Sequence, residues 1–301
     1  MSLLVCLGMV VKDIVFRVPT IPALPQKLTA HELRCQFGGM AATAAASAAA
    51  LGGNVEFWGR IGDDESGQEA LHAFSKRGVK TRVSVTVGTK SPMSAVIVDD
   101  AGERMLAVYA GQLDPATDWL PLENLHGVGA VHADFRWAEG ACALYQAARL
   151  RGIPRVLDAD AGNNEAVRSL IGLADHVIFS ERGLAGIAGD VPADQALLHV
   201  AMEAAHDPSR VIGVTLGERG SLFCYQSQIH AFPAHRITPI DTNGAGDVFH
   251  GAYALSLARG HSWMQSVAYA TTAASLKCTR DQGWDQLPDH DEVIAFMKAH
   301  S

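Results

Sequence analysis

A glycine-rich stretch, Asp241–Gly251, constrains the fold of this chain more than any other segment. It reads D-T-N-G-A-G-D-V-F-H-G and joins a proline-broken, strand-like segment over 232–240 to an amphipathic helix expected over 252–258. Gly244 and Gly246 free the backbone and leave the neighbouring amides uncovered. Bare amides at a helix start, with the helix dipole behind them, bind a phosphate or a developing oxyanion. The stretch therefore predicts an anion site at a strand-to-helix junction.

Asp247 follows the second glycine directly. A carboxylate beside an anion site repels a bound phosphate, so its presence requires a role, and accepting a proton from an attacking hydroxyl fits. We therefore predict Asp247 as the general base of a small-molecule kinase, with Gly244, Ala245 and Gly246 forming its anion hole. The alternative is an ordinary glycine-rich helix start with a capping Asp, which needs neither both glycines nor two acids.

The spacing of the glycines excludes two other phosphate-binding motifs. A dinucleotide fingerprint needs G-x-G-x-x-G directly after a strand, whereas Gly251 comes five residues after Gly246. No G-x-x-x-x-G-K-S/T sequence occurs in the chain, so a P-loop is excluded as well.

The stretch D-T-N-G-A-G-D-x-F-x-G resembles the C-terminal signature of the ribokinase-like (PfkB) carbohydrate kinases. Their N-terminal signature is matched by Gly38-Gly39 with the helix behind it, and then by Gly59–Asp64 and Gly67. The two signatures occur in the family's order, and the resemblance extends over nearly all 301 residues. It implies an ATP-dependent sugar kinase with Mg²⁺ accompanying the nucleotide. The implied α/β fold has three α/β/α layers, a mostly parallel central sheet and a small β-sheet lid.

The length and composition fit a single kinase domain over residues 1–301. The chain has 48% hydrophobic residues, enough for a full core, and a formal charge of -8 that leaves no basic face for nucleic acid. No apolar run approaches the length of a membrane span. The start has no secretion signal, and five scattered cysteines suit reduced thiols, so we expect a cytoplasmic protein. The spacing of cysteines and histidines predicts no metal site.

Strand and helix patterns alternate along the chain, which predicts a parallel sheet with helices on both faces. Ligands gather at the carboxyl ends of such strands, where Asp134–Trp137 and Asp158–Asp160 are expected. Strands are expected at 3–7, 55–60, 128–133, 155–157, 176–179 and 211–215, and helices at 38–51, 65–76, 138–151, 165–173, 262–277 and 289–300.

Two segments, at about 13–36 and 91–111, are expected to form the lid. Strand patterns at 14–18 and 28–35 are separated by prolines, and those at 93–98 and 105–109 flank a turn. A lid excludes water, which protects the transferring phosphoryl group from hydrolysis. Exposed apolar lid faces predict a homodimer through the lid.

The substrate-binding residues follow from the resemblance. It assigns Asp13 to the sugar hydroxyls, although an exposed loop Asp is the alternative. Gly38 and Gly39 would let the backbone approach the ligand, and Thr43 joins the same set.

The nucleotide-binding residues also follow from the resemblance. It makes Thr215, Gly217 and Gly220 the contacts of a T-x-G-x-x-G nucleotide loop, a sequence that by itself would indicate a β-turn. Lys277 and Cys278 lie in the region that walls the adenine in this family.

The chain departs from the family after the strand at 176–179. Many members have N-x-x-E there, whereas this chain reads S-E-R-G over 180–183. We keep Ser180 as a cofactor-binding candidate, but the glutamate's role cannot be transferred to Gly183. No metal ligand is assigned.

A finer resemblance is to the sulfofructose kinase branch. It is carried by A-D-F-R-W at 133–137, A-D-H at 174–176 leading into F-S-E, D-V-F-H-G-A at 247–252 and L-K-C-T-R at 276–280. The donor fork of Arg136 suits a sulfonate, carboxylate or phosphate, and Lys27 at the lid could add a second positive group. The lid strand lacks the asparagine expected for a sulfonate.

We therefore predict phosphorylation of a ketose-type sugar, including an anionic one such as sulfofructose. Three alternatives remain open from the sequence. Arg136 could instead form an internal salt bridge with Asp134 or Asp158. The acceptor could be a nucleoside, or the chain could be a non-catalytic sugar-binding regulator.

Overall fold

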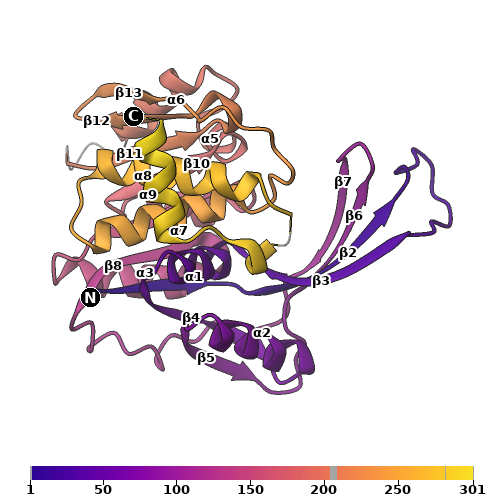
Figure 1. The fold of residues 1–301 in the computed structure, drawn as a ribbon. Coiled ribbons are helices and arrows are strands. Elements are labelled where there is room, and N and C mark those ends of the chain that lie inside the picture. Colours follow the sequence, from indigo (N-terminus) through magenta and orange to yellow (C-terminus); the bar gives the residue numbers. More distant parts are fainter. Residues whose placement is uncertain (1, 204–208, 282, 301) are drawn as a thin grey trace.

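The computed structural model describes residues 2–203, 209–281 and 283–300. Its strands form two separate sheets (Figure 1). A nine-stranded central sheet lies within a body of helices, and a four-stranded sheet, called here the small sheet, projects from one side of that body.

The central sheet has the strand order β13-β12-β11-β10-β9-β8-β1-β4-β5. Neighbouring strands from β5 to β11 pair in parallel, and β12 and β13 add an antiparallel edge. Helical crossovers cover both faces of such a sheet, which explains why its middle strands are continuous apolar runs. The strands are β1 (Leu3–Gly8), β4 (Asn54–Gly62), β5 (Lys80–Thr86), β8 (Val128–Asp134), β9 (Arg155–Ala159), β10 (His176–Ser180), β11 (Val211–Thr215), β12 (Ser221–Tyr225) and β13 (Gln228–Phe232).

The small sheet has the order β3-β2-β6-β7 and is built from two distant parts of the chain. The second strand pairs antiparallel with β3 and parallel with β6, and β6 and β7 form a hairpin. Every residue of the edge strand β7 is exposed. The four strands are β2 (Val11–Val18), β3 (Glu32–Gly38), β6 (Met93–Asp99) and β7 (Arg104–Tyr109).

The helices cover the two faces of the central sheet as two layers, each with its own hydrophobic cluster. On one face lie α1 (Met40–Ala50), α2 (Glu65–Lys76), α7 (Ala245–Ala258), α8 (Trp263–Cys278) and α9 (His290–Ala299). On the other lie α3 (Ala138–Arg149), α4 (Asn164–Ile171), α5 (Glu181–Ala188) and α6 (Ala193–Glu203). The 3-10 helices of the described ranges are η1 (Phe135–Trp137), η2 (Gly217–Arg219) and η3 (Gly283–Gln286). Within the described residues, no helix has the length and apolarity needed to cross a lipid bilayer.

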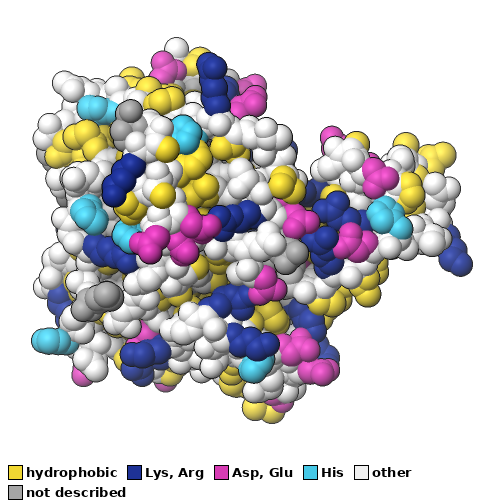
Figure 2. Space-filling view, in the orientation of Figure 1, with side chains coloured by type: hydrophobic (Ala, Val, Ile, Leu, Met, Phe, Trp, Pro, Cys, Tyr) yellow, Lys and Arg dark blue, Asp and Glu magenta, His cyan; other side chains and the backbone are white. Residues whose placement is uncertain are grey.

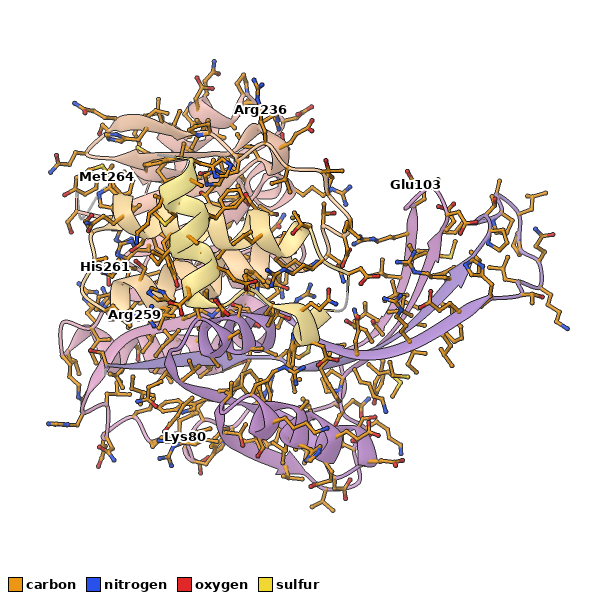
Figure 3. The ribbon with its side chains drawn as sticks, viewed as in Figure 1. Lys80, Glu103, Arg236, Arg259, His261 and Met264 are labelled. Atoms are coloured by element: carbon orange, nitrogen blue, oxygen red, sulfur yellow. The ribbon has the colours of Figure 1, made fainter. Side chains whose placement is uncertain are left out.

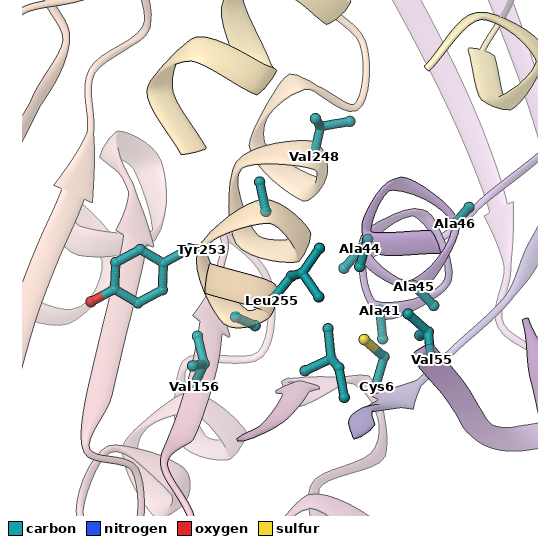
Figure 4. Close-up of a cluster of buried hydrophobic side chains, with 14 of the residues drawn as sticks. Cys6, Ala41, Ala44, Ala45, Ala46, Val55, Val156, Val248, Tyr253 and Leu255 are labelled. Atoms are coloured by element: carbon teal, nitrogen blue, oxygen red, sulfur yellow. The ribbon is translucent and has the colours of Figure 1, made fainter. Parts of the chain in front are cut away.

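Helices α1 and α7 pack closely against each other above the sheet (Figure 4). A Cβ at Gly251 would collide with the Ala44 carbonyl oxygen and with Ser47 Oγ, so the two backbones approach where neither helix has bulk. The alanine-rich sequence of α1 permits this approach because alanine forms helix well without a large side chain. Both helices begin at the same edge of the body.

Several boundaries differ from the sequence expectations. Helix α7 begins at Ala245, not at Ala252, and is buried along most of its length instead of being amphipathic. The segment over 232–240, expected to be strand-like, contains no strand beyond Phe232, which is the last residue of β13. The strand expected from Leu28 begins at Glu32. The sequence expectations did not include β5, β12, β13, α5 or α6.

Candidate active site

Polar side chains gather at the carboxyl ends of the parallel strands. Asp134 ends β8 and pairs in register with Asp158 of β9, and Ser180 of β10 pairs with Thr215 of β11. The first turns of α7 lie over this edge, since His250 of α7 contacts the Ile178 carbonyl of β10. The topology therefore brings together the ends of four strands and the beginning of one helix.

The beginning of α7 presents free backbone amides. Gly244 has a φ of 72° and a ψ of 7°, a left-handed conformation that favours glycine, and no side chain caps the helix. Among the described residues, no acceptor bonds to the amides of Gly244, Gly246 and Asp247. The Ala245 amide instead closes a turn to the Thr242 carbonyl at 3.3 Å. The amide of Asp247 thus takes the place of the Ala245 amide in the predicted set. Together the three free amides can bind an anion.

Within the part of the chain that the structure describes, no side chain fills the space where a Cβ at Gly244 or Gly246 would stand. A Cβ built on Gly246 meets no atom within 4 Å, and one on Gly244 reaches only Thr43 Cγ2 at 3.7 Å and Asp247 Oδ2 at 3.8 Å. Thr43 and Asp247 therefore flank the helix start without covering it. An oxyanion placed there would meet both the amides and a carboxylate.

Asp247 is partly buried at this helix start. Burial raises its pKa well above the ordinary value, and the neighbouring carboxylates of Asp158, Asp160 and Asp134 raise it further, while His250 opposes them. A carboxylate with raised proton affinity is a stronger base once it is ionised. The group can accept a proton from a hydroxyl that lies between it and the amides.

Asp13 lies on β2 and faces the backbone at Gly38. Its Oδ1 accepts a hydrogen bond of 2.5 Å from Ser94 Oγ, and burial raises its pKa. A Cβ at Gly38 would collide with Asp13 Oδ2, and one at Gly39, whose φ is 97°, would collide with the Met9 carbonyl. The two glycines are therefore required by close packing of the chain against itself.

The beginning of α1 is held by groups from elsewhere in the chain. Asp134 is fully buried and accepts hydrogen bonds from the amides of Met9, Ala41 and Arg136. Thr43 Oγ1 accepts a hydrogen bond of 3.0 Å from Trp284 Nε1 of η3. The beginning of α1 is thus fixed relative to the end of β8 and to η3.

The two predicted cationic residues lie apart from these contacts. The Arg136 side chain is exposed, with its guanidinium 4.9 Å from the centre of the Phe135 ring. It forms no ion pair with Asp134 or Asp158, because the hydrogen bonds of Asp134 go to backbone amides. Lys27 is exposed in the β2–β3 connection, and no hydrogen bond or ion pair among the described residues joins it to the helix start.

The predicted nucleotide loop follows β11. Gly217 and Gly220 both have positive φ, of 60° and 86°, and a Cβ at Gly220 would collide with the Phe232 carbonyl. Thr215 Oγ1 contacts the Phe179 carbonyl at 3.4 Å, and Ser180 caps α5 by accepting from the Gly183 amide at 2.9 Å. Only Gly217 has open space where a side chain would stand, and the nucleotide role of the loop stays a prediction.

The structure also explains the departure at position 183. A Cβ at Gly183 would collide with the Ala159 carbonyl oxygen, so a glutamate there would require the backbone to move. Glu181 is exposed and forms an ion pair with Arg219 instead of pointing to a ligand.

Lys277 and Cys278 support the glycine-rich loop. Lys277 is buried, and its Nζ donates to both the carbonyl and the carboxylate of Asp241 at 2.9 Å. The Cys278 carbonyl accepts from the amides of Ile240 and Asp241. Both residues thus bond to the segment that leads into α7.

Arg104 of the small sheet reaches the same loop, which the sequence did not predict. Its guanidinium donates to Asn243 Oδ1 at 3.1 Å and to Asp241 Oδ1 at 3.2 Å. Figure 2 shows Lys, Arg, Asp and Glu side chains gathered where the small sheet joins the body. No sequence motif marks Arg104, because its partners lie 137 and 139 residues away along the chain.

A surface hollow of about 720 Å³ lies elsewhere, beyond the C-terminal end of α7. Its lining includes Leu51, Arg259, His261, Tyr269 and His290, and Figure 3 labels two of these, Arg259 and His261. None of the predicted site residues lines it, so its chemistry is separate from that of the helix start.

Comparison with known proteins identifies the family. Residues 1–289 match the model of the pfkB family carbohydrate kinases. The ribokinase of Haemophilus influenzae is 24% identical over 301 residues, covering 98% of each chain, and the fructokinase of Vibrio alginolyticus is 26% identical over 291 residues, covering 88% of this chain and 92% of its own. A solved structure from Agrobacterium tumefaciens, provisionally named a ribokinase, superposes with a TM-score of 0.93 at 30% identity, covering 99% of this chain and 98% of its own. The chain therefore belongs to the pfkB family of carbohydrate kinases and has the ribokinase-like α/β fold.

Proposed function

We propose that the chain transfers the γ-phosphoryl group of ATP to a hydroxyl of a ketose-type furanose sugar. The observation that carries the proposal is the meeting of free amides and Asp247 at one helix start. The amides bind the transferring phosphoryl group, and Asp247 accepts the proton of the attacking hydroxyl. Two matched relatives are named ribokinase and fructokinase, and both names denote kinases of small sugars.

The nucleotide would lie along the loop after β11. The space beside Gly217 is open to ribose and phosphates, with Thr215 and Ser180 at the neighbouring strand ends. Mg²⁺ would arrive with ATP and neutralise the polyphosphate. The described residues contain no group of three or more His, Cys, Asp or Glu side chains arranged to hold a metal ion.

The sugar would bind between the small sheet and the body. Asp13 offers a carboxylate to paired sugar hydroxyls, beside the bare backbone of Gly38 and Gly39. Arg136 is exposed and has no ion-pair partner among the described residues, so its guanidinium is available to an anionic group such as the sulfonate of sulfofructose. Lys27 would approach such a group only if the β2–β3 connection bends toward the body.

An assay of ADP release across a panel of sugars tests this function. The panel contains fructose, ribose, sulfofructose, a phosphorylated ketose and a nucleoside, each with ATP and Mg²⁺. We expect turnover with a ketose. If sulfofructose is preferred and Arg136→Gln loses that preference, Arg136 is the partner of the sulfonate. Turnover with the nucleoside alone would reassign the acceptor. Binding of a sugar without ADP release would make the protein a regulator.

We further propose that residues 1–301 form one domain and that the small sheet, from segments 13–36 and 91–111, is its lid. We propose that this lid also pairs with the lid of a second copy of the chain. Leu33, Met105, Leu106, Val108 and Tyr109 are each about half exposed or more on this sheet. An apolar surface on an unpaired sheet favours association. Sedimentation should show a dimer that Leu106→Glu converts to monomer; a monomeric wild type at micromolar concentration would reject the pairing.

A further inference from the structure

A cluster of buried ionisable side chains lies beneath the first turns of α7. The proposed transfer step uses only Asp247 of this region, so the others have no assigned role. The members, His132 and Asp134 of β8, Asp158 of β9 and His250 of α7, are each at most 3% exposed. Burying this many titratable groups costs stability unless they are paired.

Both ring nitrogens of His250 face backbone carbonyls. Nδ1 lies 2.8 Å from the carbonyl oxygen of Gly246, and Nε2 lies 3.2 Å from that of Ile178. A carbonyl oxygen can only accept, so each contact is favourable only if the nitrogen carries a proton. Neutral imidazole has one such proton, and the ring therefore needs a second from a neighbour.

Asp158 is the neighbour that can supply this proton. Its Oδ2 lies 3.3 Å from His250 Nδ1, and no well-aligned hydrogen bond reaches that oxygen from the described residues. Burial raises the pKa of Asp158 well above the ordinary value, as do the carboxylates of Asp160 and Asp134. Burial also lowers the pKa of His250, against the bonds to Gly246 and Ile178. Burial disfavours the charged form of each group. A proton that lies between Asp158 Oδ2 and His250 Nδ1 therefore gives the carboxylate a donor and the ring nitrogen a proton without a net charge on the pair.

We propose that Asp158 and His250 share one proton, and that this pair positions the Gly246 end of the anion hole and sets the proton affinity of Asp247. The inference rests on the proposed phosphoryl transfer, for which Asp247 is the base. With the shared proton the pair has no net charge; without it, the pair places a negative charge beside Asp247. The described titratable or charged groups that face the pair are Asp247 on the helix of His250, Asp160 after β9, His132 and Asp134 on β8, Arg136 on η1 and Tyr145 on α3.

Nuclear magnetic resonance of the full-length wild type tests the proton directly. With ¹⁵N-labelled histidine, we expect His250 Nε2 to be protonated and Nδ1 to show the shift of a protonated or proton-sharing nitrogen at neutral pH. The signal is assigned by its loss in His250→Asn. A bare Nδ1 with the ordinary shift of an unprotonated imidazole nitrogen would overturn the proposal, and this readout does not depend on enzyme activity.

The pH profile of kcat tests the effect on Asp247. His250→Asn can still donate to the Gly246 carbonyl but cannot share a proton, so the acid limb of the profile should move to higher pH by about one unit. Asp158→Asn leaves an amide beside a neutral imidazole, so the pair again has no net charge and the limb should stay close to its wild-type position. A purely structural role would lower kcat in both variants without moving the limb in His250→Asn.

His176→Gln is the matched control. His176 is a partly buried histidine whose Nδ1 contacts Tyr253 Oη at 2.9 Å, and desolvation lowers its pKa to about 4, so it is neutral where the enzyme would work. Its replacement should leave the limb unmoved. An unchanged limb in His250→Asn would overturn the proposal. A wild type that releases no ADP with any sugar would instead reject the proposed function, while the resonance experiment would still decide whether the proton is shared.

Discussion

Asp247 combines a raised pKa with a position beside free amides, and the two properties determine its mutant behaviour. Asp247→Asn keeps the shape of the side chain but cannot accept a proton. We expect sugar and nucleotide binding to persist while kcat falls by about two to four decades. Calorimetric binding and ADP release measure the two effects, and near-normal turnover would reject Asp247 as the base.

Gly246 gives a test of the anion hole that does not disturb the fold. Its Cβ position is open and its φ is not positive, so Gly246→Ala should fold and gain slightly in helix propensity. The added methyl group would project beside the free amides and hinder the phosphoryl group. We expect kcat/KM for ATP to fall by about 100-fold, comparable with loss of an oxyanion donor.

Gly172→Ala is the control for this substitution. Position 172 has equally open space and a φ of -67° at the end of α4, away from the amides. Its kinetics should match the wild type. Equal losses in both variants would mean that the effect of Gly246→Ala is not specific to the anion hole.

Single residues were predictable from the sequence where a motif names them. The D-T-N-G-A-G-D stretch predicted free amides beside Asp247 at a helix start, although the helix begins at Ala245 instead of Ala252 and Ala245 uses its amide in a turn. His250 stood in the same stretch, but its role depends on Asp158 and Ile178, which only the fold brings near. No local pattern could reveal those partners.

The small sheet is joined to the glycine-rich loop by Arg104, which follows Glu103 at the β6–β7 turn (Figure 3). Arg104→Gln removes the ion pair to Asp241, which is partly exposed and worth about 1 kcal/mol or less. We therefore expect the melting temperature to change little. Because the small sheet no longer bonds to the glycine-rich loop through this residue, we expect KM for the sugar to rise by up to about tenfold.

Arg236→Gln is the corresponding control. Arg236 is exposed in the segment after β13 and forms no hydrogen bond or ion pair with the described residues. Arg236→Gln should leave KM for the sugar unchanged. An unchanged KM in Arg104→Gln as well would show that this contact does not serve substrate binding.

Strands and helices were predictable where pattern and packing agree. The capping box at Ser262 and Gln265 marked the start of α8 correctly. Helix α7 was misjudged because it packs under α1 and α8 as well as on the sheet, so its apolar residues occupy every side. Strand β5 was missed because its K-T-R-V-S-V-T sequence alternates at an exposed sheet edge, where propensity alone gives a weak signal.

The buried carboxylates make the stability of the folded protein depend on pH. Asp247 has a folded-state pKa above its unfolded value, so its burial costs nothing below its ordinary pKa of about 4 and destabilises the fold as pH rises through the raised value. Asp247→Asn removes that cost. We expect the inactive variant to be more stable than the wild type at pH 8, with the difference shrinking toward pH 5.

Urea unfolding at several pH values measures this difference. Asp190→Asn is the control, because Asp190 is exposed and forms no hydrogen bond or ion pair with the described residues. It should give the same curve as the wild type at every pH. A pH-independent difference for Asp247→Asn would contradict the linkage.

The bond from Trp284 to Thr43 has a consequence for synthesis. Trp284 also packs against Phe37 and Phe74. A residue that is synthesised late therefore completes a group of contacts with residues that are synthesised much earlier. While the ribosome still holds the last segment, those aromatic faces stay open to water. We expect a nascent chain to complete these contacts beside the beginning of α1 only after Trp284 has left the ribosome.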